Sequence, residues 1–371
     1  MKSIALMDPL LSKDVGGHGI WIKLIAKYSA ELTGAHIVLG TRTDISEVTK
    51  QRVGVSHHYA EVFTTNAFSE FRTDISQKVP RQRIAIARDC TVAASKLANC
   101  DLQVYPTAMA ATALGVAAAK KRSNHTVLLF QYPLEEVSDR DFLYRQDLLS
   151  ILQNPNKHRI HCLATTEGIA ADFSVLGIPC KVAAFGHFAQ QKARAPKNQL
   201  QHIGILGAQR PEKDGGLLLP LVQALLANKF RVTLQDTRKN KFAFSHPNLQ
   251  IIDQFLMPDK FHDLAASTDA NIITNEPTYF TKRFSGVATE SLAAGVPIVA
   301  PSTTHMAWMA SRFNAGVAYK ERTPQSILSA VNQLQKNYTA VAQGAIRSSD
   351  WLTSEHGLKN LTLSLLNAVN V

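Results

Sequence analysis

Arg210 and Lys213 lie three residues apart in the segment Gly207-Ala-Gln-Arg-Pro-Glu-Lys-Asp-Gly215, which separates an apolar run from a helical pattern. Arginine supplies a planar fork of donors and lysine a compact charge, so the two together can neutralise a diphosphate. The alternative is a solvated loop in which Glu212 and Asp214 balance the cations. Because the segment follows the carboxyl end of a predicted strand, where α/β sheets bind ligands, we favour the phosphate role.

Gly16 and Gly17 belong to a second loop, Asp14-Val-Gly-Gly-His-Gly19, which also joins a predicted strand to a predicted helix. Adjacent glycines allow close backbone approach, and free N–H groups at a helix start attract phosphate. The loop lacks the Gly-x-Gly-x-x-Gly order and the Gly-Lys-Ser/Thr ending of known nucleotide loops. A plain turn stays open as the alternative to phosphate or acceptor contact. His18 and Asp14 are candidate general bases, and a loop histidine without a catalytic role is the alternative for His18.

The third segment runs from Asn275 to Pro301, and in it a predicted strand ends, a loop follows and a helix opens at Ser285-Gly286. The first N–H groups of that helix, at Ser285, Gly286 and Val287, are suited to a diphosphate. Glu290, one turn further on, can accept hydrogen bonds from ribose hydroxyls. The alternative is an ordinary helix of a parallel sheet with an exposed Glu290.

The elements that must position these residues repeat in one order: a short apolar strand, a glycine-marked or polar loop, then a helix. This order indicates parallel α/β architecture. The pattern stops in residues 187–200, which we interpret as a linker, and restarts at His202. Residues 54–83 are polar and irregular in pattern, and the basic residues Lys78, Arg81, Arg83 and Arg88 are candidates for one face of a helix. We predict two Rossmann-like βα domains facing each other across a cleft, at 1–190 and 200–349, with a helix in 350–371 that crosses back to the first.

The composition is that of a globular protein with a surplus of cations. The chain has 371 residues, of which 45% are hydrophobic, with 40 Lys+Arg against 29 Asp+Glu, a formal net charge of +11. A positive balance suits nucleic acid, an anionic membrane surface or phosphate-bearing substrates. Basic clusters occur around residues 78–88, 120–122 and 238–241, and aromatic residues are not interleaved with them, so we expect no nucleic-acid partner. Four dispersed cysteines predict neither a disulfide frame nor a zinc site, and they favour a reducing, cytoplasmic location.

The third segment resembles the nucleotide-sugar signature of GT-B glycosyltransferases of the group 1, family-four-like superfamily. Glu290-Ser-Leu-Ala-Ala-Gly-Val-Pro-Ile-Val-Ala300 is similar to that signature's acidic residue, small-residue helix and Gly-x-Pro-Val-Val ending. The segment 207–215 resembles the family's phosphate loop, with Lys213 at its lysine and Ala208 at its arginine, so Arg210 is a displaced candidate. Gly16-Gly17 matches the first-loop glycine pair, residues 166–179 resemble the last strand–helix unit of the N-terminal domain, and residues 351–366 resemble the terminal helices.

Two positions depart from the family pattern. The glutamate that contacts the donor sugar, eight residues before Glu290, is Lys282 here, and the glycine expected at 285 is serine. Glu276, further upstream, could substitute for that glutamate. Where retaining members carry a histidine in the N-terminal domain, this chain has Phe130-Gln-Tyr-Pro133, which leaves the donor sugar and the stereochemical outcome open.

The resemblance implies a glycosyltransferase that needs neither a cofactor nor a metal and uses a nucleotide-diphosphate sugar, with UDP or GDP as the nucleotide. The donor would bind at 200–349, with Phe255 and Leu256 near the base, and the acceptor at 1–190. A glycan or lipid-linked acceptor implies polysaccharide biosynthesis, with a possible peripheral site at the inner face of a membrane. A sugar-nucleotide epimerase on the same scaffold and a non-catalytic basic binding protein are the alternatives.

Overall fold

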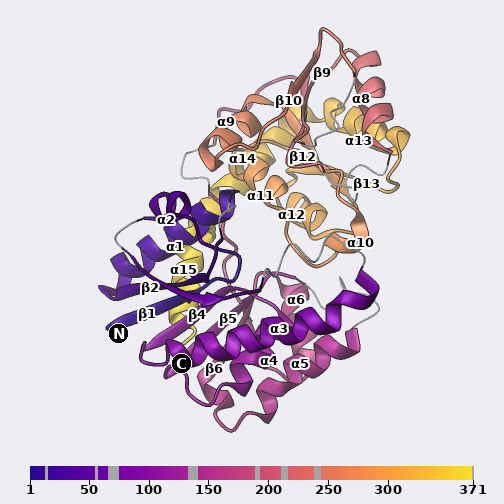
Figure 1. The fold of residues 1–371 in the computed structure, drawn as a ribbon. Coiled ribbons are helices and arrows are strands. Elements are labelled where there is room, and N and C mark those ends of the chain that lie inside the picture. Colours follow the sequence, from indigo (N-terminus) through magenta and orange to yellow (C-terminus); the bar gives the residue numbers. More distant parts are fainter. Residues whose placement is uncertain are drawn as a thin grey trace. The chain divides into compact units, whose positions relative to one another are not determined.

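The structure is a computed structural model of the whole chain, and it describes residues 1–12, 16–54, 57–65, 75–132, 141–188, 193–209, 216–237 and 244–369. It leaves out the side chains of 16–18, 75–82, 141–144 and 279. Two compact units make up the chain (Figure 1). Unit 1 comprises Met1–Phe185 and Leu358–Val371, and unit 2 comprises Gly186–Gly357.

Unit 1 is built on a parallel sheet whose seven described strands have the order β3-β2-β1-β4-β5-β6-β7. Their apolar runs are buried; in β4, for example, every residue is buried, as expected for strands covered on both faces. The strands are β1 (Ser3–Met7), β2 (His36–Arg42), β3 (His58–Phe63), β4 (Leu102–Ala108), β5 (His125–Phe130), β6 (Ile160–Ala164) and β7 (Cys180–Val182).

The helices of unit 1 cover this sheet, with α1 against α2 and a second layer in which α3 contacts α4 and α4 contacts α5 (Figure 1). They are α1 (Gly16–Thr33), α2 (Glu47–Val53), α3 (Ile75–Lys96), α4 (Ala110–Ala118), α5 (Asp141–Gln153), α6 (Glu167–Val175), α15 (Gly357–Asn367) and the short 3-10 helix η2 (Lys157–Arg159). Strand order reverses between β1 and β4, which makes that place the topological switch point of the sheet.

A glycine sets the distance between α3 and α4. A Cβ at Gly115 would lie 2.2 Å from the carbonyl oxygen of Ala87 and 2.7 Å from Cβ of Cys90. The two helices are therefore closer than any residue with a side chain at 115 would allow.

On the neighbouring helix α5, the buried carboxylate of Asp147 accepts a hydrogen bond from Nε of Arg83 at 2.6 Å.

Unit 2 contains a second parallel sheet, with six described strands in the order β10-β9-β8-β11-β12-β13. Leu221, Val222, Ile203 and Val232 are among the fully buried residues of its core. The strands are β8 (His202–Ile205), β9 (Arg231–Gln235), β10 (Leu249–Ile252), β11 (Ala270–Ile272), β12 (Ile298–Pro301) and β13 (Gly316–Tyr319).

The helices of unit 2 form two sets by their contacts: α8 with α13, and α9, α12 and α14 around α11. They are α8 (Leu218–Ala227), α9 (Pro258–Ser267), α10 (Pro277–Phe280), α11 (Gly286–Ala293), α12 (His305–Phe313), α13 (Pro324–Lys336) and α14 (Tyr338–Glu355). The switch point lies between β8 and β11, because the strands that follow β8 are added on one side of it and those that follow β11 on the other.

The first and last residues of unit 2 lie against each other. A Cβ at Gly357, whose φ is +89°, would lie 3.3 Å from Nε2 of His187. The same imidazole nitrogen is 3.0 Å from the carbonyl oxygen of Leu352, near the end of α14. His187 thereby joins the start of the unit 2 segment to the last turns of α14.

The predicted fold class, two Rossmann-like α/β domains, is confirmed. The irregular stretch 54–83 contains β3 and the start of α3, and α3 is the helix expected around residues 78–88. β3 buries only part of its side chains, and the sequence of α3 begins with polar and charged residues, so neither has a continuous apolar signal. In the tail, a break at His356 separates α14 from α15, and α15 belongs to unit 1 from Leu358 on.

Candidate functional site

The site begins at the carboxyl edge of the unit 2 sheet, where Gln235 joins the ends of three strands. Its side-chain Oε1 accepts a hydrogen bond from the backbone N–H of Gly207, after β8, at 2.8 Å. Its Nε2 donates to the carbonyl oxygen of Gln254, after β10, at 3.0 Å. Gly207 has a φ of +84°, a conformation that glycine adopts without strain. One amide thus fixes the start of the loop that follows β8.

Gln209 continues this loop with a buried side chain. Its Nε2 donates to the carbonyl oxygen of Gly207 at 2.9 Å. Its Oε1 is buried and has no hydrogen-bond partner among the described residues. The next residues, 210–215, lie outside the described part of the chain, so the predicted roles of Arg210 and Lys213 stay predictions.

On the other side of the switch point, α11 begins with an open first turn. Ser285 occupies the N-cap position but its side chain makes no capping hydrogen bond. At Gly286 an added Cβ would find nothing within 4 Å, and Val287 is half-buried. The first N–H groups of a helix have no partner inside the helix and carry partial positive charge. This end of α11 can therefore accept an anion such as a phosphate.

Glu290 lies one turn along α11 and is buried, with 7% of its surface exposed. Its Oε1 accepts a hydrogen bond from the backbone N–H of Phe188 at 2.7 Å. The alternative of an exposed Glu290 on an ordinary helix is therefore wrong. A buried carboxylate that is held by a backbone donor has a fixed orientation, as a group that binds ribose hydroxyls would need.

Glu276, the candidate substitute for the donor-sugar glutamate, lies between β11 and α10. Its Oε2 accepts a hydrogen bond from Nη1 of Arg322 at 3.0 Å, and Nε of Arg322 donates to the carbonyl oxygen of Thr274 at 3.1 Å. Lys282 is half-buried, and the guanidinium of Arg283 lies 3.9 Å from the ring centre of Phe280. Arg322 and Gln235 could not be predicted as site residues from the sequence, because their partners lie in distant segments.

The candidate base contacts follow β10. Phe255 is 76% exposed and Leu256 is half-buried, directly after the carbonyl of Gln254 that Gln235 holds. An aromatic ring that is open to solvent on an anchored loop is available for stacking on a planar group. The positions of both residues are compatible with the predicted contact, which stays a prediction.

At the carboxyl edge of the unit 1 sheet, α1 begins with the predicted glycine pair, Gly16-Gly17. Asp14 and the side chain of His18 lie outside the described part, so their roles as general bases stay predictions. Gln131 belongs to the segment 130–133, where the resemblance implies a histidine in retaining members of the family. Its Nε2 donates to the carbonyl oxygen of Pro106 at 2.9 Å, which joins the ends of β5 and β4.

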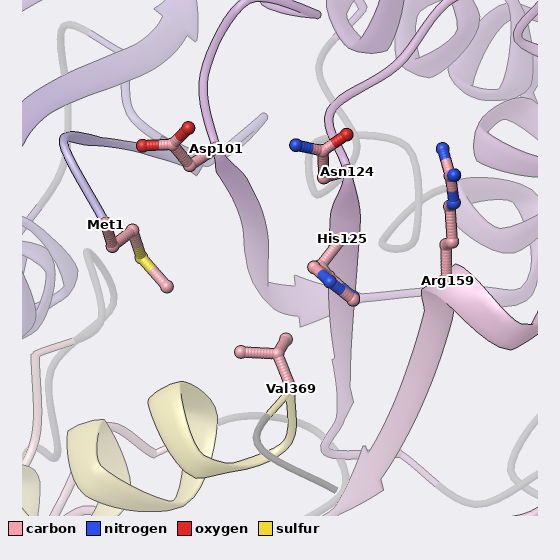
Figure 2. A pocket seen from close by; sticks show the side chains of 6 residues that line it. All are labelled: Met1, Asp101, Asn124, His125, Arg159 and Val369. Carbon is pink, nitrogen blue, oxygen red and sulfur yellow. The ribbon is translucent and has the colours of Figure 1, made fainter.

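A hollow of about 430 Å³ lies at the opposite edge of the unit 1 sheet, where β1, β4, β5 and β6 begin. Figure 2 shows the side chains that line it. Ligands of such sheets bind at the carboxyl ends of the strands, and the helices that return here present their negative carboxyl ends. We therefore do not assign the substrate site to this hollow. It is lined by Met1, Asp101, Asn124, His125, Arg159 and Val369.

Two arginines of the basic clusters, Arg122 and Arg83, have structural partners. Arg122 donates to Asn154 Oδ1 at 2.9 Å and to the carbonyl oxygens of Val116 and Asn156. Arg83 is paired with Asp147, as described above. The side chains of Lys78 and Arg81, and residues 238–241, lie outside the described part. None of the helices in the described ranges has both the length and the apolar character required to span a membrane.

The sequence matches no family model and none of the curated proteins. Solved structures, in contrast, match along the whole chain. Sucrose-phosphate synthase from Thermosynechococcus elongatus aligns with a TM-score of 0.71 at 11% identity, over 100% of this chain and 98% of that one. HepE from Anabaena in complex with UDP aligns with a TM-score of 0.67 at 16% identity, over 100% of both chains.

A third similar structure is the calicheamicin glycosyltransferase CalG4, with a TM-score of 0.59 at 14% identity over 100% of this chain and 98% of that one. HepE has also been solved with UDP-glucose, and that structure aligns with a TM-score of 0.65 at 16% identity over 100% of both chains. At these identities the likeness concerns the fold. With its two Rossmann-like units and these neighbours, the chain has the GT-B fold of glycosyltransferases.

Proposed function

We propose that this protein is a glycosyltransferase that transfers a sugar from a nucleotide-diphosphate sugar to an acceptor without a metal ion. The observation that carries the proposal is the start of α11: an uncapped first turn at Ser285, an open position at Gly286, and the buried, oriented carboxylate of Glu290 one turn on. HepE, which shares the fold, has been solved with UDP and with UDP-glucose, which supports a uridine nucleotide as the first donor to test.

The leaving group of this reaction is a nucleoside diphosphate, on which negative charge grows as the bond to the sugar breaks. Donors placed in advance around that charge lower the barrier. In our proposal these donors are the first N–H groups of α11 together with Arg210 and Lys213. Glu290 binds the ribose, and Phe255 and Leu256 lie at the base.

The acceptor is proposed to bind unit 1 near the start of α1. Inversion of configuration at the sugar requires a base that takes the acceptor's proton, and His18 and Asp14 are the candidates. Retention requires no such base. A glycan or a lipid-linked acceptor is the proposed class, and the latter would bring the enzyme to the inner face of a membrane as a peripheral protein.

The deciding experiment is a screen of UDP- and GDP-sugars that measures thermal stabilisation of the protein and release of nucleoside diphosphate. A ligand that binds the folded state raises its stability by mass action. We expect one donor to stabilise the protein and to release diphosphate when acceptor is added, with or without EDTA. Loss of turnover in EDTA would contradict metal independence alone.

The same screen separates the two alternatives. An epimerase converts a nucleotide sugar without any acceptor, which product analysis of the donor alone reveals. A non-catalytic binding protein gains no stability from any nucleotide diphosphate. Lys213→Ala tests the leaving-group role: we expect turnover to fall strongly while the circular dichroism spectrum stays unchanged, and unchanged turnover would overturn that role.

A further inference from the structure

Arg322 joins two segments that are 46 residues apart in sequence. It follows β13, and its guanidinium donates hydrogen bonds to the segment that leaves β11: from Nε to the carbonyl oxygen of Thr274 at 3.1 Å and from Nη1 to Oε2 of Glu276 at 3.0 Å. The side chain of Arg322 is 19% exposed and that of Glu276 33%. The ion pair is shielded from water on the arginine side, while the carboxylate stays accessible.

The position of Arg322 is unusual for a cation. It directly precedes Thr323, the N-cap of α13, at the edge of the sheet where α10 and α11 also begin. Helix starts carry partial positive charge and favour anions, so an arginine here is repelled unless a carboxylate is paired with it. Glu276 provides that carboxylate, and the ion pair fixes its orientation.

Glu276 is also the only acidic residue between Asn275 and Thr289, the loop and first helical turn that form the donor side of the proposed site. Where the resembled family has its sugar-contacting glutamate, this chain has Lys282. The carboxylate oxygen Oε1 of Glu276 has no hydrogen-bond partner among the described residues. A partly exposed carboxylate with one oxygen anchored and the other available is suited to accept a hydrogen bond from a sugar hydroxyl.

We infer that Arg322 is a positioning residue that orients Glu276 toward a hydroxyl of the donor sugar. The inference rests on the proposed function, because it names the group that binds the sugar part of the same donor. Arg322 itself need not touch the sugar. Its fork fixes one carboxylate oxygen of Glu276 and the backbone from which Glu276 extends.

A purely structural role of Arg322 is the competing explanation, and the chain offers a matched control for it. Tyr319, three residues earlier, donates its hydroxyl hydrogen to the carbonyl oxygen of Ile273 at 2.9 Å. Tyr319 therefore anchors the same segment but is not bonded to Glu276. Removal of its hydroxyl, in Tyr319→Phe, weakens the anchor and leaves the Arg322–Glu276 pair in place.

The experiment compares Arg322→Ala, Arg322→Lys, Glu276→Gln and Tyr319→Phe in the full-length protein. UDP-glucose and UDP are the first probes, to be replaced by the donor and diphosphate from the screen if these differ. We expect Arg322→Ala and Glu276→Gln each to weaken UDP-glucose binding and kcat/KM by about 10- to 100-fold, the range for one charge-assisted hydrogen bond. Affinity for UDP, which lacks the sugar, should stay within about twofold.

The double variant Arg322→Ala/Glu276→Gln should be no worse than Glu276→Gln alone, since residues that act through one contact are not additive. Arg322→Lys should recover part of the loss. Tyr319→Phe should lower the melting temperature and leave the ratio of UDP-glucose to UDP affinity unchanged.

Three results would overturn the inference. They are equal losses of UDP and UDP-glucose affinity in Arg322→Ala, additive losses in the double variant, or a shifted affinity ratio in Tyr319→Phe. Failure of the proposed function looks different: the wild-type protein would then bind no nucleotide sugar, as a non-catalytic protein, or convert it without acceptor, as an epimerase.

Discussion

The backbone N–H of Phe188 donates a hydrogen bond to Oε1 of Glu290 at 2.7 Å, so the carboxylate at the proposed ribose position also holds the segment with which unit 2 begins. Glu290 belongs to α11 and Phe188 precedes β8, more than a hundred residues earlier. One side chain therefore links the start of unit 2 to the helix that we propose as the diphosphate site.

Substitution of Glu290 should separate these two roles. Glu290→Ala leaves the N–H of Phe188 without its partner, and we expect it to lower the free energy of unfolding by about 1–3 kcal/mol. Glu290→Gln keeps an acceptor and should cost less. Both should weaken nucleotide-sugar binding, because glutamine has one acceptor oxygen in place of two and alanine has none. Urea unfolding measures the loss of stability, and nucleotide-sugar titration measures the loss of affinity. Equal stability of Glu290→Ala and Glu290→Gln would show that the hydrogen bond from Phe188 does not stabilise the fold.

Gly286→Ala tests whether a phosphate approaches the start of α11. The position is open, with nothing within 4 Å of an added Cβ, and the first helical residue tolerates alanine. We expect an unchanged melting temperature and a loss of about tenfold or more in affinity for the nucleoside diphosphate, because a methyl group would occupy the space that the phosphate needs. Full affinity in this variant would place the diphosphate elsewhere.

Gly115→Ala should act on stability alone. Its Cβ would overlap the carbonyl oxygen of Ala87 and Cβ of Cys90, so α3 and α4 would have to move apart. Overpacking of this kind costs about 1–3 kcal/mol. Chemical denaturation should show that loss, with Gly286→Ala as the matched glycine that has room. Equal stability of Gly115→Ala and wild type would mean that the two helices adjust without cost.

His202 should make the fold sensitive to acid. It is buried in β8, where Nη2 of Arg231 donates to its Nδ1 at 2.7 Å and its Nε2 lies 2.8 Å from Oγ1 of Thr233. Burial, and then the charge of Arg231, lower the pKa of His202 to about 4 from 6.5. The imidazole is therefore neutral in the folded protein between pH 4 and 6.5, whereas in the unfolded chain it takes up a proton.

Because the unfolded state binds more protons in that window, stability should fall as the pH drops from 6.5 to 4. A shift of this size corresponds to about 3 kcal/mol for His202. Unfolding free energies measured across this range should show the slope, and His202→Asn, which cannot be protonated, should flatten it. If His202→Asn loses stability with falling pH as steeply as wild type, His202 is not a source of the acid sensitivity.

Much of the fold follows from local patterns, and the contacts at the site do not. β10 at Leu249–Ile252 and α6 from Glu167 agree with the apolar runs and glycine stops of the sequence. The helix–strand unit of α11 and β12 was likewise predicted from Ser285, Gly295 and Pro297. These signals lie within a few residues of one another.

Arg322 and Glu276, in contrast, are separated in the sequence by α10, α11, β12, α12 and β13. They become neighbours only when the strands align in the sheet. The hydrogen bond from Gln235 to the carbonyl oxygen of Gln254 likewise depends on the pairing of β9 with β10, which no local pattern in the sequence reveals. Side chains that bond one strand end to another leave no periodic pattern in the sequence. For this reason the predicted site includes Glu276 but not Arg322.

The double hydrogen bond of Gln235 restricts which residue can occupy that position. The side chain must accept from the N–H of Gly207 and donate to the carbonyl of Gln254 at the same time. Glutamate can accept but not donate when ionised, lysine can donate but not accept, and asparagine is one methylene too short. Related chains that preserve this edge should therefore keep glutamine at 235, even where the residues around it have changed.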